Sequence, residues 1–98
     1  QLWRLHNIMY TTELIADIFK AAGDSVTLIN RDANYAAYIT RTDSGETEDT
    51  WKATIKRNVD HLEIIKAYKH ENGSSIWTSE DFTAIDAAIV KGKTFYGG

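Results

Sequence analysis

The chain has 98 residues, no cysteine and a net charge of −3. This composition excludes a disulfide framework, a thiolate nucleophile and a cysteine-based zinc site, and the acidic balance disfavours nucleic acid as a partner. No apolar run approaches the roughly 20 residues that a membrane span requires. We therefore expect residues 1–98 to form a single small globular domain that does not enter a membrane.

The first ten residues are more apolar than most N-termini. Their large apolar side chains are Leu2, Trp3, Leu5, Ile8, Met9 and Tyr10. The segment lacks the core length and the cleavage site of a signal peptide. We expect residues 1–10 to form an edge strand or an arm on a partner, with Trp3 and Leu5 as candidate interface residues. The single methionine, Met9, leaves open that residues 1–8 are non-native or the cut end of a longer protein.

From residue 11 the pattern becomes helical. One side of the expected helix carries the apolar residues Leu14, Ile15, Ile18, Phe19 and Ala22. Thr11 or Thr12 is a suitable N-cap, and Gly23 can adopt the left-handed conformation that ends a helix. The sequence thus predicts a helix that ends near residue 22.

Two segments with β-type composition follow. Residues 25–30 (SVTLIN) and 34–41 (NYAAYITR) are rich in β-branched or aromatic side chains, and a short polar connection separates them. This pattern predicts a β-hairpin whose register stays open. Because an isolated hairpin is marginally stable, it must pack on the helices, pair with the N-terminus or pair across subunits.

Residues 46–69 are predicted to form the longest helix. Its core stripe consists of Trp51, Ile55, Val59, Leu62 and Ile65, which fall within an arc of about 120°. Asn58 lies inside this arc and therefore needs a hydrogen-bond partner if it is buried. Ile64 and Tyr68 form a second apolar flank, which indicates a second neighbour. That neighbour is the C-terminal segment, another subunit or a ligand.

A short final helix is predicted after a polar loop at residues 70–75. Thr78 as N-cap with Asp81 three residues later forms a capping box, and Trp77 with Phe82 suits a hydrophobic staple. Gly92 is expected to close this helix, leaving residues 93–98 as a tail. The predicted fold class is α+β, in the order helix, β-hairpin, long helix, short helix, with an N-terminal edge strand as an option.

A search for catalytic and metal-binding patterns identifies none. His6, His61 and His70 lie on different elements, and no pair has the spacing that places two imidazoles on one metal. The paired carboxylates occur at predicted helix starts, where the helix dipole accounts for them. Ser74 and Ser75 have no base assigned nearby. We therefore assign no catalytic residue, no cofactor and no metal site, and we expect a protein that is not an enzyme.

Two C-terminal segments carry a family resemblance. Residues 57–68 (RNVDHLEIIKAY) and 76–93 (IWTSEDFTAIDAAIVKGK) resemble the C-terminal region of small accessory proteins of no assigned activity that tailed phages and other mobile elements encode. The resemblance covers about a third of the chain and carries no catalytic motif. It implies a virion-associated or accessory protein.

Two functional hypotheses follow. The leading one is a non-catalytic structural or protein-interaction domain, a homo-oligomer or bound to a protein partner, that is cytoplasmic or virion-associated and not secreted. Its candidate interface residues are Trp3, Leu5, Ile64 and Tyr68. The alternative is a small-molecule-binding module with a pocket between the hairpin and the long helix. That pocket would be lined by Tyr38, Trp51, Asn58 and Trp77.

Overall fold

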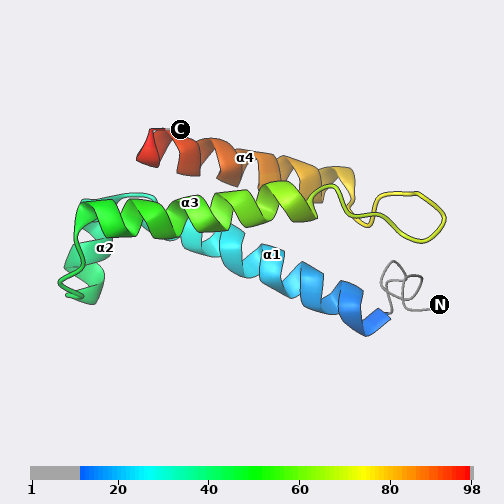
Figure 1. Cartoon of the computed structure of the whole chain (residues 1–98), viewed down its shortest axis with the longest axis horizontal. Coiled ribbons are helices and arrows are strands. Elements are labelled where there is room, and N and C mark those ends of the chain that lie inside the picture. Colours follow the sequence, from blue (N-terminus) through cyan, green and yellow to red (C-terminus); the bar gives the residue numbers. More distant parts are fainter. Residues whose placement is uncertain (1–11, 98) are drawn as a thin grey trace.

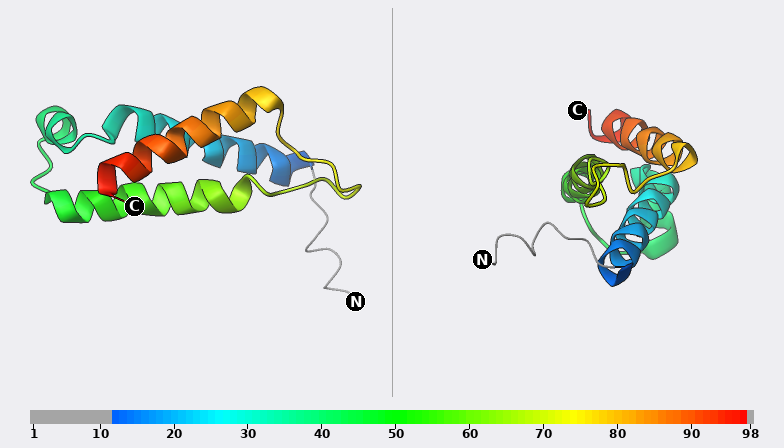
Figure 2. Two further views of the ribbon diagram at one scale, coloured as in Figure 1. Left: turned by 90° about the horizontal axis from the view of Figure 1, so that it is seen from above. Right: turned by 90° about the vertical axis from the view of Figure 1, so that its right-hand side faces the viewer.

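The computed structural model describes residues 12–97, and all four regular elements in this range are helices. They are α1 (Thr12–Asp32), α2 (Tyr35–Thr42), α3 (Glu48–Ile65) and α4 (Ser79–Tyr96). In Figure 1, α3 lies between α4 and α1. The end-on view in Figure 2 places the three long helices at the corners of a triangle. The described domain is therefore all-α, and the optional N-terminal strand lies outside the described residues.

The predicted β-hairpin is wrong, because both of its segments are helical. Residues 25–30 continue α1, where Ser25 and Ile29 extend the buried stripe that begins at Ile18 and Ala22. Burying an isoleucine fully contributes roughly 1.5–3 kcal/mol, which outweighs the roughly 1 kcal/mol that Gly23 costs inside a helix. The helical spacing of core residues thus overrides the β-branched composition, and the α+β class is corrected to all-α.

The second predicted strand is α2, a short helix with a cap at each end. The Asn34 backbone is extended, and its side chain accepts a hydrogen bond from the amide of Ala37 at 3.0 Å. At the other end, Asp43 adopts the left-handed conformation with φ of 51°. Polar residues that cap a helix locally therefore fix this segment as helical despite its aromatic and β-branched content.

The central helix α3 is shorter than predicted, because Thr47 caps its start and Ile65 ends it. At 21 residues, α1 is longer than α3, which has 18. The predicted core stripe is confirmed, since Trp51, Ile55, Val59, Leu62 and Ile65 are all buried. Asn58 has the expected partners: it accepts from the Ser25 hydroxyl at 2.8 Å and donates to the Thr54 carbonyl at 2.9 Å.

The last helix begins as predicted but does not end as predicted. The Thr78 and Asp81 capping box is present, while α4 continues past Gly92 to Tyr96 and is closed by Gly97 with φ of 83°. The residues assigned to a tail therefore include the last turn of α4. Phe95 and Tyr96 are half-buried and pack against the core.

Gly92 is needed where it stands because three helices meet around it. A Cβ at this position would lie 2.4 Å from Cγ2 of Val59, 3.4 Å from Ile55 and 3.6 Å from Ile29. No real Cβ tolerates the first of these distances without movement of its neighbours. The backbone of α4 thus packs directly against α3 and α1 at this point.

We predict opposite effects of alanine at two helical glycines. Gly92→Ala should lower the free energy of unfolding by roughly 1–3 kcal/mol, because the new methyl group collides with Val59 in a packed core. Gly23→Ala should raise it by roughly 0.5–1 kcal/mol, because a Cβ at Gly23 meets nothing within 4 Å. Urea denaturation of both variants measures the difference, and equal effects would contradict the close packing at Gly92.

Candidate functional site

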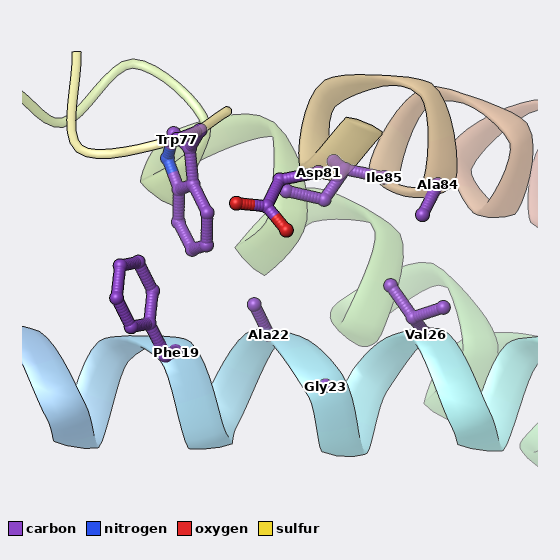
Figure 3. A pocket seen from close by; sticks show the side chains of 8 residues that line it. All are labelled: Phe19, Ala22, Gly23, Val26, Trp77, Asp81, Ala84 and Ile85. Atoms are coloured by element: carbon purple, nitrogen blue, oxygen red, sulfur yellow. The ribbon is translucent and has the colours of Figure 1, made fainter. Parts of the chain in front are cut away.

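An open cleft of about 430 Å³ lies between the middle of α1 and the beginning of α4. Its lining residues are Phe19, Ala22, Gly23, Val26, Trp77, Asp81, Ala84 and Ile85. Figure 3 shows the α1 residues on one wall, facing Trp77 and the first turns of α4 on the other. Because most of the lining is apolar, the cleft suits an apolar group.

Two aromatic rings form the end of the cleft nearest the N-terminus of α1. The rings of Phe19 and Trp77 are 5.1 Å apart at 56° to one another, a tilted arrangement that aromatic pairs favour. Trp77 is buried, and its indole Nε1 donates to the carbonyl of Ile65 at 2.8 Å. Phe19 stays 44% exposed. One ring is therefore fixed by the fold, while the other presents apolar surface to solvent.

The middle of the cleft is open because its residues are small. In Figure 3, Ala22 of α1 lies beneath Asp81 and Ala84 of α4 lies opposite Val26, while Gly23 lines the cleft without a side chain. Among the described residues of the lining, Asp81 alone is charged, and its carboxylate points into the space between the walls. Its Oδ2 accepts from the Thr78 amide at 3.0 Å. The cleft thus combines apolar walls with one negative charge held at a helix start.

The predicted small-molecule pocket is not formed, because the hairpin that should build one wall is helical. Tyr38 stacks on Trp51, with ring centroids 3.6 Å apart and planes 6° apart. Asn58 bonds to Ser25 further along α3, and the indole of Trp77 bonds to the far end of that helix. The structure therefore brings Tyr38 and Trp51 together and separates them from the other two residues.

The predicted interface residues are only partly described. Ile64 is 60% exposed on α3, and Tyr68 is half-buried against the core. Trp3 and Leu5 lie outside the described residues. The C-terminal helix does not cover Ile64, although Lys93 of α4 reaches the neighbouring Glu63 at 2.8 Å.

Sequence reasoning missed most residues of the cleft. Phe19 was assigned to the buried face of its helix, and Gly23 to a helix end. One signal was present: Phe19 and Val26 recur seven residues apart, the spacing of one helical face, with Gly23 between them. This pattern becomes visible only if the helix is continued through Gly23.

The strongest charge cluster lies elsewhere, at the corner between α1 and α2. The Asp32 side chain is 1% exposed, and its Oδ2 accepts from Arg41 at 2.6 Å and from Arg31 at 3.0 Å. Its backbone carbonyl accepts from the Trp51 indole at 2.8 Å. Asp32 thereby joins the end of α1 to α2 and α3, so we interpret the cluster as structural.

The described range shows neither a metal-binding cluster nor a membrane-spanning helix. No group of three or more potential metal ligands occurs within residues 12–97. Among the helices of this range, none is both long and apolar enough to cross a membrane.

No protein-family model, curated protein or solved structure matches the sequence significantly. The function must therefore be argued from the residues themselves.

We predict that Arg41→Met destabilises the domain by about 1–3 kcal/mol, because the buried Asp32 carboxylate loses a charged donor. Arg57→Met is the matched control, since Arg57 donates to the exposed Thr54 hydroxyl at 2.9 Å and its loss should change stability by less than about 0.5 kcal/mol. Urea denaturation distinguishes the two. Similar losses in both variants would show that the corner contributes no special stability.

Proposed function

We propose that this chain is a small, non-catalytic structural or protein-interaction domain that self-associates through the cleft between α1 and α4. The observation that carries the proposal is the apolar lining, with Phe19 44% exposed beside the buried Trp77. Aromatic side chains next to well-packed pockets commonly anchor protein interfaces. A second copy of the chain is the partner that we test first.

The polar groups of the cleft favour binding over catalysis. Asp81 is the one titratable residue that the described part of the chain contributes to the lining, and its carboxylate already accepts a hydrogen bond from the Thr78 amide. General acid or base chemistry requires a group within reach of a reacting atom and commonly a second polar group that orients it. The lining supplies apolar surface and a single charge, which suits recognition of an apolar segment with a positive residue.

The family resemblance adds a biological setting to the proposal. Residues 76–93, which resemble phage accessory proteins, include Trp77 and Asp81 and so build one wall of the cleft. We propose an accessory or virion-associated role in which association of copies, and not a chemical step, is the activity. Such a role places the protein in the cytoplasm or in a particle.

We predict that filling the cleft blocks self-association without unfolding the domain. The unaltered chain should show a mass that rises with concentration in light scattering, whereas Gly23→Leu should remain monomeric because it adds a bulky side chain at a residue that lines the cleft. Gly23→Ala is the matched control, since it removes the glycine but leaves most of the space. The alanine variant should melt no lower than the unaltered chain, because a Cβ there meets nothing within 4 Å, and the melting temperature of the leucine variant shows whether it stays folded.

Two results would contradict this proposal. A strictly monomeric chain at high micromolar concentration would rule out self-association. Equal association of the leucine and alanine variants would move the interface away from the cleft, with the exposed Ile64 on α3 as the next surface to test.

A further inference from the structure

The loop between α3 and α4 carries an exposed asparagine that is followed by a glycine. This loop extends beyond the ends of both helices in Figure 1, and residues 71–75 at its tip are all exposed. Asn72 is the only asparagine of the chain that precedes a glycine. An asparagine side chain can close a cyclic imide with the backbone nitrogen of the next residue, and glycine has no side chain to hinder that closure. The loop tip is therefore the place in the sequence where this reaction meets least hindrance.

The tip is a tight hairpin turn that requires a glycine directly after Asn72. The His70 carbonyl accepts from the Gly73 amide at 2.9 Å, and the His70 amide donates to the Ser74 carbonyl at 2.7 Å. Gly73 has a φ of 90°, which residues with a side chain rarely adopt. Hairpin loops of this length commonly combine a turn with a glycine in the left-handed position. The backbone of the hairpin thus accounts for the residue that follows Asn72.

The side chain of Asn72 is held toward the backbone nitrogen that could attack it. Its Oδ1 accepts from the Ser74 amide at 2.9 Å and from the Ser74 hydroxyl at 2.7 Å. The ring of atoms that the first bond closes includes the Gly73 nitrogen, so the carboxamide carbon is restrained near that nitrogen. Both donors also face the oxygen on which negative charge grows when the nitrogen adds to the carbon, and donors placed in this way stabilise such charge.

We propose that Asn72 is a self-modification site, at which the Gly73 nitrogen attacks the side-chain carboxamide carbon. The new carbon–nitrogen bond closes a cyclic imide. The bond from that carbon to the side-chain nitrogen breaks, and the nitrogen leaves as ammonia with the proton of the Gly73 amide. Water then opens the imide at either of its carbonyl carbons, which gives aspartate or isoaspartate. Both products carry a carboxylate in place of an amide, so the net charge of −3 becomes more negative by one.

One hydrogen bond of the folded loop opposes the reaction. The Gly73 amide has to leave the His70 carbonyl and lose its proton before the nitrogen can attack. Exposed turns open locally at a small cost in free energy, so this bond slows the reaction without preventing it. Asn58 shows the contrasting case, because the next residue, Val59, belongs to α3 and is buried in the core. Conversion should therefore be confined to the loop.

The isoaspartyl product would disturb the hairpin. It inserts the side-chain methylene into the backbone, so the turn becomes longer by one backbone atom. The bridge between Lys69 and Ser75 follows directly on this turn, and the Ser75 hydroxyl accepts from the Trp77 amide at 3.1 Å. Because Trp77 lines the cleft, conversion of Asn72 alters the segment that leads to it. The modification itself rests on the loop alone and not on the proposed function.

The first experiment follows the asparagines of the full chain during incubation in mildly alkaline buffer. Peptide mass spectrometry should show that Asn72 is converted many-fold faster than Asn34, and that both aspartate and isoaspartate form. Asn34 is the internal control, because its Oδ1 also accepts a backbone amide but the next residue, Tyr35, carries a large side chain. Equal rates at the two positions would overturn the proposal. Aspartate without isoaspartate would overturn it as well, because that result indicates direct hydrolysis of the amide.

A pair of serine variants tests the geometry of the turn. Ser74→Ala removes one of the two donors to Asn72 Oδ1 and should slow the conversion several-fold. Ser75→Ala makes the same change one residue later and leaves both donors in place, so the rate should stay close to that of the unaltered chain. In denaturant all of these chains should react at similar rates. Equal rates of the two variants in native buffer would overturn the role assigned to the Ser74 hydroxyl.

Discussion

The close approach at Gly92 is the constraint on which the arrangement of the helices depends. At this point the backbone of α4 lies against the side chains of Val59 and Ile55 from α3 and Ile29 from α1. Helices are stiff, so a tight contact at one end lets them diverge toward the other. In Figure 1, α1 diverges from α3 and α4 toward its N-terminus. The cleft beside Phe19 lies in that diverging region and is thus a consequence of how the core packs.

Two tryptophans fix the ends of α3 and thereby hold the geometry of the cleft. The indole of Trp51 donates to the carbonyl of Asp32, and the indole of Trp77 donates to the carbonyl of Ile65, each at 2.8 Å. A buried indole N–H that lacks a partner would be unfavourable, so each bond selects one position of the ring. Because Trp77 is also a wall of the cleft, the same contact that closes α3 shapes the surface proposed to bind.

Features that depend on residues close together in the sequence were predicted correctly. Features that depend on contacts between different helices were not. The stripe on α3 and the Thr78 capping box depend on residues a few positions apart, so the sequence alone predicts both. The hairpin was wrong because β-branched composition in residues 25–41 was preferred to a helical stripe that becomes clear only when it is followed through Gly23. Gly92 was interpreted as a helix end because its real neighbour, Val59, belongs to another helix. For the same reason the cleft, which joins Phe19 to Trp77, could not be predicted.

The residues proposed to dock differ from the residues that hold the core of this small domain. The core is complete without Phe19, which remains 44% exposed, and burying a phenylalanine side chain contributes roughly 1.5–3 kcal/mol. Only the part of this contribution that belongs to the exposed surface of Phe19 remains for a partner that covers the ring. Gly92 is fixed by the packing of three helices, whereas Gly23 leaves space that no described side chain fills. If Gly23→Ala stabilises the domain as predicted, the proposed binding beside it explains why the chain has a glycine at this position.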